Sequence, residues 1–554
     1  MRVLGIEGTA WAASAALYDA AEDTTVIESD PYQPASGGIH PREAAEHMGE
    51  AIPQVIQAIL DHAAETVVPD DAGGHDDETD RPNEYGIDAV AFSRGPGLGP
   101  CLRTVGTAAR AAAQTLGVPL VGVNHMVAHL EIGHHQSGFA SPVCLNASGA
   151  NAHLLGYHNG RYRVLGETMD TGVGNALDKF TRHIGWSHPG GPKIEQAATD
   201  GEYIDLPYVV KGMDFSFSGI MSAAKDAADD GEAIEDICFS LQEHVFGMLC
   251  EVAERALSLT GTDELVLGGG VGQNGRLQEM LEAMCEERGA SFYVPEPRFL
   301  RDNAGMIAVL GAKQFAAGDT LAIADSAVDP NFRPDHVPVT WRTNEPSVAR
   351  GLADAPATQR GAEAVVETFE PEDSTQSLPA RCVRKQRVAK SYRHPALDET
   401  LRSERTTAEA KLTSQARRVG VPTPLVWDVD PQNSTIVFEH VGTRDLAAEL
   451  APDPVQEVGS HLAAIHEAGF VHGDPTTRNV RVGDRTWLID FGLGFHTGHI
   501  EDHAMDLHVF RQSLEATADD PEPLCAAAVA GYAERGDSAV LDRLSTIEGR
   551  GRYQ

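Results

Sequence analysis

A short buried strand, a small polar loop and a second strand occur near the start of the chain, and the same pattern occurs again further along it. The first copy has strands at 3–6 and 13–18 around Glu7-Gly8-Thr9, and a long amphipathic helix is expected from about Pro41. The second copy has a strand at 143–147, a polar turn at 148–151, and strands at 154–157 and 162–165 joined across Asn159-Gly160, a strong hairpin signal. A unit that occurs twice predicts a duplicated α/β fold with a ligand-binding cleft between the copies.

The length of the chain, 554 residues, exceeds what one hydrophobic core usually holds and predicts more than one domain. Residues 342–360 are rich in Asn, Pro, Ala, Asp, Thr and Gly and show no apolar period, which is typical of a linker. We therefore expect a first domain at 1–341, a linker at 342–360 and a second domain at 361–554. The acidic, glycine-rich segment 69–78 is expected to be a surface insertion.

The chain is strongly acidic: 43 basic against 82 acidic residues give a net charge of -39. The acidic residues are spread over both halves of the chain instead of forming a tail. Such a surface repels itself in dilute salt, but it is tolerated in molar salt, where the Debye length falls to roughly 3 Å. The charge therefore indicates adaptation to high salt and excludes no ligand, because an acidic surface would also mask a basic stripe for nucleic acid.

The seven cysteines form no Cys-x2-Cys pair, so they predict neither a zinc ribbon nor a disulfide framework. The N-terminus runs directly into a strand without the apolar segment of a signal peptide, and no window approaches the roughly 18 apolar residues of a membrane span. We therefore expect a cytoplasmic protein that does not bind a membrane.

His125 and His129 lie one helical turn apart, so both imidazoles would share one face of a helix. With a carboxylate from elsewhere in the chain they would form a three-ligand metal site with open positions, the kind of metal site that does chemistry. An acidic residue, in Arg301-Asp302-Asn303, lies far downstream of the pair. On spacing alone, such a pair is more often an ordinary surface or core feature. A metalloprotease would also use two spaced histidines, but proteases of the His-Glu-x2-His type need a glutamate directly after the first histidine, where this chain has Met126.

Residues 472–479 read His-Gly-Asp-Pro-Thr-Thr-Arg-Asn, and Asp-Phe-Gly follows at 490–492. Asp-x4-Asn followed by Asp-Phe-Gly at the end of a strand is the residue set of phosphoryl transfer. In that set Asp474 orients or deprotonates the acceptor, whereas Asn479 and Asp490 hold Mg²⁺ on the phosphates of ATP.

Two charged residues upstream fit the same chemistry: Lys385 is placed to pair with the phosphates, and Glu409 is placed to hold that lysine from a helix. Without Asp490, both would be taken as ordinary surface charges. Some usual kinase parts are missing, because 361–364 read Gly-Ala-Glu-Ala in place of a glycine-rich loop, no Ala-Pro-Glu follows Asp490, and Gly473 replaces an arginine. A signalling protein kinase with a nucleotide-binding N-terminal domain is the main alternative function, and the missing segment for docking protein substrates argues against it.

These residues, together with Lys-Ser-Tyr-Arg-His-Pro at 390–395, make the part from 361 onward resemble the small atypical serine/threonine kinase of the KEOPS complex. The resemblance implies a small α+β protein-kinase-like domain that uses ATP and Mg²⁺ and works mainly as a partner-stimulated ATPase, with serine autophosphorylation as a second activity. The residues it implies are Gly361, Lys385 and Glu409 for ATP binding, Asp474 for catalysis, and Asn479 and Asp490 for Mg²⁺.

The first 341 residues resemble another KEOPS component, the tRNA threonylcarbamoyl transferase. The histidine pair carries this resemblance, together with motifs at 37–44, 95–100, 189–192 and 214–219. It implies an α/β fold of the duplicated actin and sugar-kinase type, in agreement with the repeated unit. It also implies transfer of the threonylcarbamoyl group from threonylcarbamoyl-AMP to N6 of the tRNA adenosine 3′ of the anticodon. The expected partners are tRNA, threonylcarbamoyl-AMP and other KEOPS subunits.

Carried over by position, the resemblance implies iron or zinc bound by His125, His129 and Asp302. Asn146 stands where archaeal relatives have a tyrosine as fourth ligand, and Ala150 replaces the second glycine of the turn. The implied mechanism is direct: the metal polarises the threonylcarbamoyl group, adenine N6 attacks the carbonyl, and AMP leaves without a side-chain nucleophile. The residues implied to bind the adenylate are Ser148, Asn151, Asp178, Gly191, Glu195 and Asn274.

Overall fold

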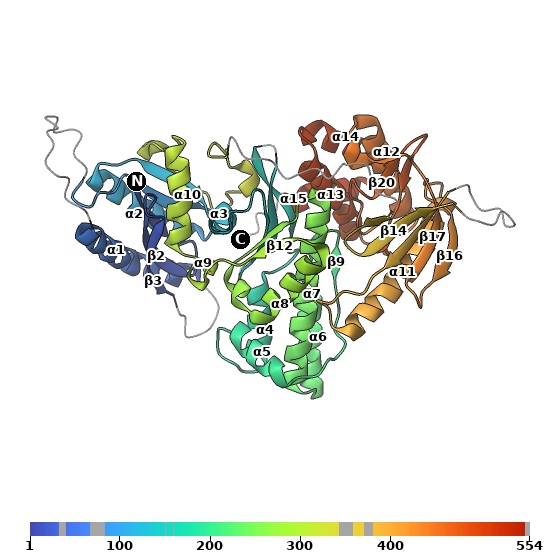
Figure 1. Cartoon of the computed structure of the whole chain (residues 1–554), viewed down its shortest axis with the longest axis horizontal. Helices are drawn as coiled ribbons and strands as arrows, with labels where there is room; N and C mark the ends of the chain where they lie inside the picture. The colour runs from blue at the N-terminus through green and yellow to red at the C-terminus, as the bar shows by residue number, and fades with distance from the viewer. Residues whose placement is uncertain are drawn as a thin grey trace.

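Two five-stranded sheets with the same strand order form the N-terminal part of the chain (Figure 1). The computed structural model describes residues 1–32, 40–66, 83–149, 151–158, 160–342, 358–370 and 381–548. The sheet orders are β3-β2-β1-β4-β5 and β8-β7-β6-β11-β12, and in each the central strand pairs antiparallel with the next strand and parallel with a strand that follows a helix. This shared topology confirms the duplicated α/β fold. The strands are β1 (Arg2–Glu7), β2 (Ala12–Asp19), β3 (Thr24–Pro31), β4 (Ala89–Gly95), β5 (Leu120–Asn124), β6 (Val143–Ala147), β7 (Ala152–His158), β8 (Arg161–Glu167), β11 (Glu264–Gly268) and β12 (Ser291–Tyr293).

The hairpin predicted in the second copy is present. Tyr157 on β7 lies opposite Tyr162 on β8. Gly160 has φ +73°, which is the left-handed conformation that a two-residue hairpin turn requires and that glycine adopts without strain. Asn159 lies outside the described residues.

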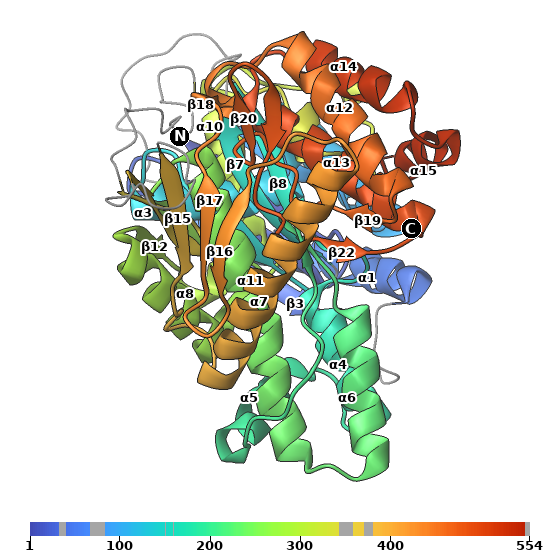
Figure 2. The ribbon, with the colours of Figure 1, turned by 90° about the vertical axis from the view of Figure 1, so that its right-hand side faces the viewer.

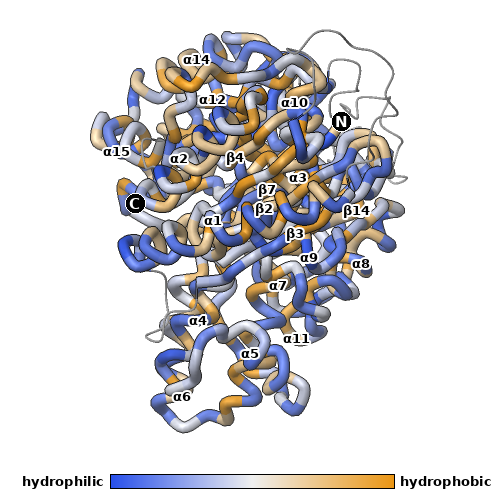
Figure 3. Tube along the Cα trace, turned by 90° about the vertical axis from the view of Figure 1, so that its left-hand side faces the viewer, coloured by the Kyte–Doolittle hydropathy of each residue, from blue (hydrophilic) through white to orange (hydrophobic). Residues whose placement is uncertain are grey.

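Helices α3 (His125–Ser137) and α10 (Ala304–Ala316) form the layer between the two sheets. One apolar cluster joins these helices to Val121 of the first sheet and Val266 of the second, and Figure 3 shows hydrophobic residues concentrated there. Helix–sheet–helix–sheet–helix layering of this kind confirms the actin and sugar-kinase architecture expected for the N-terminal part. The outer helices are α1 (Pro41–Thr66) and α2 (Gly99–Leu116) on the first sheet, and α4 (Val173–His183), α5 (Gly191–Ala197), α6 (Ser218–Asp230), α7 (Ile234–Thr260) and α8 (Gly275–Arg288) beside the second. Shorter elements are α9 (Pro297–Leu300), β9 (Val210–Lys211) and β10 (Asp214–Phe215).

The C-terminal part consists of a small sheet lobe and a larger helical lobe (Figure 2). The small lobe is an antiparallel sheet of order β13-β14-β15-β17-β16 with one long helix, α11, against it. The helical lobe is built around Leu462, Phe510 and Tyr532, which are fully buried or nearly so. The small lobe contains β13 (Thr358–Arg360), β14 (Ala364–Phe369), β15 (Cys382–Arg387), α11 (Pro395–Arg418), β16 (Val426–Asp430) and β17 (Thr435–Glu439). The helical lobe contains β18 (Arg444–Asp445), α12 (Pro452–Glu467), β19 (Phe470–Val471), β20 (Val480–Val482), β21 (Thr486–Leu488), β22 (Phe495–His496), α13 (Ile500–Thr517), α14 (Pro521–Ala533) and α15 (Ser538–Glu548).

The segment expected as a linker, 342–360, is folded at both of its ends. Arg342 is 1% exposed, its guanidinium is 3.3 Å from the Glu131 carboxylate, and it lies over the ring of Tyr157. At the other end, Thr358–Arg360 forms strand β13. These ends therefore belong to the folded parts, contrary to the expectation, because a buried ion pair and a sheet pairing hold them. Residues 343–357 lie outside the described residues, as do the segment 69–78, the first three residues of the motif at 37–44, and Ala150.

Glu131 is expected to be a large contributor to the stability of the N-terminal part. It is fully buried and pairs with Lys313 at 2.8 Å and with Arg342. Burial raises its pKa, but Lys313, His134 and Arg342 outweigh burial and hold the pKa of Glu131 well below its ordinary value. Glu131→Ala should lower the free energy of unfolding by about 3–5 kcal/mol, because it leaves the buried Arg342 guanidinium without its carboxylate.

Denaturant unfolding at neutral pH in molar KCl measures this loss, with the exposed Glu279→Ala as the control. Because the folded-state pKa is depressed, the contribution of Glu131 is present above the unfolded pKa and is lost as the pH falls. A loss smaller than about 1 kcal/mol would show that Arg342 is held by its other contacts.

Buried ion pairs join the N-terminal and C-terminal parts along helix α7, which lies beside α11 in Figure 2. Glu251 on α7 is 2.7 Å from Arg393 and 2.9 Å from Arg405, and Glu254 is 2.6 Å from Lys390. Lys390 and Arg393 belong to the Lys-Ser-Tyr-Arg-His-Pro stretch. This stretch is therefore an interface with the N-terminal part.

All seven cysteines are buried and free. Within the described ranges, no helix has the length and apolar character needed to span a bilayer.

Candidate active sites

The three residues predicted to bind a metal come together between the two sheets. Oδ1 of Asp302 is 3.4 Å from Nε2 of His125 and 3.3 Å from Nε2 of His129, and ligand atoms of the three residues lie within 4.8 Å of one another. Both histidines are in the first turns of α3, whose start is capped by the side chain of Asn124. Asp302 directly precedes Asn303, whose side chain caps the start of α10. Two capped helix starts thus fix the cluster.

Glu7, which was not singled out from the sequence, supports the cluster from behind His125. It ends strand β1, is fully buried, and places Oε2 3.2 Å from Nδ1 of His125. Its Oε1 accepts the backbone N–H of Thr9 at 2.8 Å, and the Ser93 hydroxyl donates to Oε2. A carboxylate on the far nitrogen of a metal-binding imidazole fixes its tautomer and orientation. In the sequence, Glu7 is recognisable only as an acidic residue directly after an apolar strand, because nothing in the local pattern indicates its contact with His125.

The charges of this cluster suit a bound cation. Burial opposes a charge on His125, but the carboxylates of Glu7 and Asp302 outweigh burial and raise the pKa of His125 to about 10. Burial also opposes ionisation of Asp302, but the two histidines hold its pKa below the ordinary value. Two imidazoles and a carboxylate are donors that divalent transition metals accept, and such an ion would take the place of the proton.

Asn146, the position that departs from the family, lies beside His129. A Cβ added to Gly268 would be 3.6 Å from Asn146 Oδ1 and 3.7 Å from the Cβ of His129. Asn146 is directly opposite His153 on the neighbouring strand, and both are buried. Among the described residues, Asn146 Oδ1 and both ring nitrogens of His153 have no hydrogen-bond partner. The polar surroundings of the metal site therefore extend onto the second sheet.

Two of the residues expected to bind the adenylate close the turn after β6. The Ser148 hydroxyl accepts the backbone N–H of Asn151 at 3.1 Å and donates to its carbonyl at 2.8 Å. The Ser148 carbonyl accepts the N–H of Gly174 at 3.2 Å, which joins this turn to the start of α4. The same helix carries Asp178, so three of the expected residues are on adjoining segments.

The others lie near α5 and α8. Asp178 Oδ1 accepts the N–H of Gly190 at 2.7 Å, and Gly191 has open space where a Cβ would be. Glu195 Oε1 accepts the N–H of Gly275 at 2.8 Å, directly after Asn274, which caps α8. Ser148 and Asn151 thus follow β6 and Asn274 follows β11, at the carboxyl ends of strands where α/β folds commonly bind nucleotides. The residues on α4 and α5 are joined to these segments by the hydrogen bonds just described.

A second constellation surrounds a pocket of about 740 Å³ that is lined mainly by the C-terminal part and also by residues within 255–263 of the N-terminal part. Its lining contains all six residues expected there: Gly361, Lys385, Glu409, Asp474, Asn479 and Asp490. Gly361 closes a tight turn between β13 and β14, with its N–H donating to the Ala364 carbonyl at 2.9 Å.

Lys385 is held between two carboxylates in this pocket. Its Nζ is 2.9 Å from Glu409 Oε1 on α11 and 2.7 Å from Asp490 Oδ1. Burial raises the pKa of Asp490, but Lys385 and Arg387 outweigh burial and lower it to about 2. Asp490 therefore stays ionised, as a Mg²⁺ ligand must.

Asp474 meets an arginine from the other part of the chain. Its Oδ2 accepts from Asn479 Nδ2 at 3.0 Å and from Arg255 Nη1, on α7, at 2.7 Å. Burial raises the pKa of Asp474 to about 7, although Arg255 acts in the opposite direction. Arg255 was missed from the sequence, because nothing around it resembles a kinase motif.

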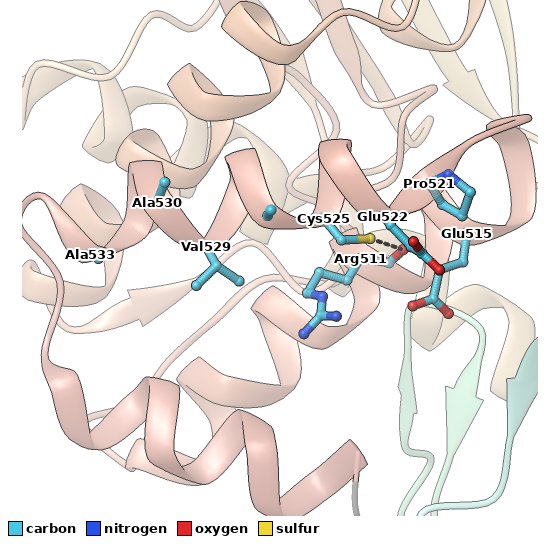
Figure 4. A pocket seen from close by; sticks show the side chains of 9 residues that line it. Arg511, Glu515, Pro521, Glu522, Cys525, Val529, Ala530 and Ala533 are labelled. Atoms are coloured by element: carbon cyan, nitrogen blue, oxygen red, sulfur yellow. Dashed lines mark hydrogen bonds between the residues drawn. The ribbon is translucent and has the colours of Figure 1, made fainter.

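Another pocket, of about 530 Å³, lies between α13 and α14 in the helical lobe (Figure 4). Arg511 and Cys525 line it, and the Cys525 thiol donates to the Arg511 carbonyl at 3.9 Å. None of the expected site residues lines this pocket.

Comparison with known proteins assigns the chain to a family. A family model described as tRNA N6-adenosine threonylcarbamoyltransferase matches residues 78–309. A protein of Haloquadratum walsbyi, described as a probable bifunctional tRNA threonylcarbamoyladenosine biosynthesis protein, is 66% identical over 555 residues and covers 100% of both chains. The chain belongs to this family.

Relatives of lower identity align over the whole length as well. The bifunctional tRNA threonylcarbamoyladenosine biosynthesis protein of Methanospirillum hungatei is 50% identical over 554 residues, covering 100% of this chain and 99% of its own. That of Methanosarcina mazei is 45% identical over 566 residues, covering 100% of this chain and 99% of its own. Membership confirms both the resemblance seen in the sequence and the expected class of bifunctional, tRNA-modifying transferase.

Proposed function

We propose that the N-terminal part transfers the threonylcarbamoyl group of threonylcarbamoyl-AMP to N6 of the tRNA adenosine 3′ of the anticodon, at a site built on His125, His129 and Asp302. The observation that carries this proposal is the convergence of these three ligands beside the turns after β6 and β11. Gly268, the last residue of β11, links the metal ligands to these turns, since it lies between His129 and the Asn146 side chain. A divalent metal held by the three ligands would act as a Lewis acid on the threonylcarbamoyl carbonyl.

The residues of the second half bind and orient the adenylate. Asp178 and Glu195 each use one carboxylate oxygen on a backbone N–H, at Gly190 and Gly275, which fixes the side chain. The second oxygen of Glu195 accepts from a ribose hydroxyl, and Asp178 Oδ2, which is also 3.0 Å from His188 Nδ1, accepts from another. The open space at Gly191 lets the nucleotide approach the backbone.

The transfer itself balances without a covalent enzyme intermediate. A bond forms between adenine N6 and the carbonyl carbon, the bond from that carbon to the AMP phosphate oxygen breaks, and N6 loses one proton. Holding the donor and the acceptor together in the right orientation removes much of the entropic part of the activation barrier.

We propose that the C-terminal part is a protein-kinase-like module of small α+β fold that hydrolyses ATP and phosphorylates serine as a second activity. Support comes from the pairing of Lys385 with Glu409 and Asp490 and from the contact of Asp474 with Asn479 in the same pocket. Asn479 and Asp490 would hold Mg²⁺, which would neutralise charge on the phosphates of ATP. Lys385 would pair with the phosphates, and Gly361 would let the backbone approach them. We assign residues 1–342 to the transferase module and 358–554 to this module, since Arg342 and strand β13 belong to the folded parts. We propose other KEOPS subunits as partners of the chain.

Incubation of the full chain with tRNA and threonylcarbamoyl-AMP, followed by mass analysis of the tRNA nucleosides, tests the transferase proposal. The expected product is N6-threonylcarbamoyladenosine, formed together with AMP. Release of AMP should require tRNA, because the acceptor is adenine N6. Equal AMP release without tRNA, with unmodified nucleosides, would show that the site is a hydrolase of the adenylate.

A further inference from the structure

We propose that Arg255 of the transferase module is a catalytic residue of ATP hydrolysis in the C-terminal pocket, where its guanidinium binds the terminal phosphate while it holds Asp474. This inference rests on the proposed ATPase function and adds a residue from the other module to it. Arg255 lines the same pocket as Lys385 and Asp490.

The position of Arg255 is fixed from its own helix and from both lobes of the C-terminal part. Its Nε donates to Glu251, one turn earlier on α7, at 3.1 Å. Its Nη1 donates to Asp474 at 2.7 Å, and its Nη2 donates to Glu363, in the Gly-Ala-Glu-Ala turn, at 2.5 Å. The side chain is 11% exposed. A side chain held at three points is preorganised, so little entropy is lost when a substrate arrives.

Arg255 retains a donor for a phosphate. A guanidinium carries five N–H groups. The contacts described above use one from each nitrogen, and Nη2 is also 3.1 Å from Glu251 Oε1, so the second N–H of Nη1 remains. This donor is on the nitrogen that binds Asp474. A charged N–H donor suits an oxygen of a phosphoryl group.

Asp474 keeps an oxygen for the attacking water. The donors to its carboxylate from the described part of the chain, Arg255 and Asn479, both bind Oδ2. Oδ1 can therefore orient water toward the terminal phosphorus. In the reaction the bond from water oxygen to phosphorus forms, the bond from phosphorus to the ADP oxygen breaks, and the proton of water passes to Asp474 and on to solvent.

The carboxylates at this end of the pocket need a cation to neutralise them. Glu363, Asp474 and Asp490 all line it, and Lys385 is engaged by Glu409 and Asp490. Arg255 is the cation that touches Asp474, so it is placed where negative charge develops on the transferred phosphoryl group. The alternative is that the ion pair with Arg255 keeps Asp474 from orienting the attacking water. That alternative predicts faster ATP hydrolysis when Arg255 is replaced.

The test compares full-length wild type with Arg255→Gln and Arg255→Lys in molar KCl, measuring ATP hydrolysis and thermal unfolding. Arg255→Gln should lower kcat roughly 100-fold or more, with KM for ATP changed by less than about 3-fold, because the guanidinium acts on charge that develops during the reaction. Arg255→Lys keeps the charge but not the planar guanidinium that binds Asp474 and Glu363 at the same time, and its kcat should fall roughly 10-fold or more. Arg276→Gln is the matched control, because it removes a guanidinium from Glu243 on the same helix, away from Asp474.

Unchanged or faster hydrolysis in both Arg255 variants would overturn the inference. If Arg255→Gln fails to fold, the test is the affinity of Arg255→Lys for ADP with aluminium fluoride, which mimics the transferred phosphoryl group. Arg255→Lys should bind this mimic roughly 10-fold or more weakly than wild type does, and should bind ADP alone as tightly as wild type. Equal affinity for the mimic would count against Arg255. Wild type that hydrolyses no ATP would refute the proposed ATPase itself, whereas hydrolysis lost in an Asp490 variant but kept in the Arg255 variants would refute this inference alone.

Discussion

Replacement of His129 by alanine is expected to release the metal and to lower threonylcarbamoyl transfer roughly 100-fold or more, because two ligands hold a divalent ion far less tightly than three. His129 is 1% exposed, and its Nε2 faces Asp302 at 3.3 Å. The fold should be nearly unchanged, since α3 keeps its Asn124 cap and its apolar contacts through Leu130. Elemental analysis of the purified protein and single-turnover transfer to tRNA measure the two effects.

His135→Ala is the matched control for this experiment. His135 is on the same helix but pairs with Asp23 at the surface and is 25% exposed. This variant should keep the metal and transfer within about 3-fold of wild type, as expected for a surface substitution. If the His129 variant lacked metal and still transferred at the wild-type rate, the metal would have no part in the reaction.

The sequence was sufficient to predict those parts of the fold that depend on local pattern. The repeated strand pattern and the turn at Asn159-Gly160 encode sheet geometry within a few residues, and both are present. The metal ligands were predicted partly by local spacing, since His125 and His129 are one turn apart. Asp302, by contrast, came from the family resemblance, because a contact across 173 positions has no local pattern.

The residues that were missed act through contacts that no local pattern encodes. Glu7 meets His125 across 118 positions, and Arg255 meets Asp474 across 219. Each looked like an ordinary charge in its own segment. The ends of the expected linker were wrong for the same reason, since the composition around Arg342 is that of a loop, but burial against Glu131 holds it in the fold.

Replacing Asp490 by asparagine is expected to lower ATP hydrolysis roughly 100-fold or more, because Mg²⁺ loses an ionised ligand. Asparagine is the right substitution here, since Asp490 has φ +64°, a conformation that Asn adopts far more readily than Ala. Asp484→Asn, in the exposed turn between β20 and β21, is the matched control.

Transfer from preformed threonylcarbamoyl-AMP should survive in the Asp490 variant for at least one turnover. The donor is already activated, and its expected ligands, such as Ser148 and Asn274, are on the other module, so no step of a single transfer draws on ATP. Rapid-quench measurement of modified tRNA, beside an assay of released inorganic phosphate, separates the two activities. Persistent ATP hydrolysis in this variant would show that the ATPase site is in the N-terminal part. Loss of both ATP hydrolysis and the first turnover of transfer would mean that the Lys385–Asp490 pair is coupled to the transferase site. The coupling would pass through α7, whose Glu251 and Arg255 contact the C-terminal module directly.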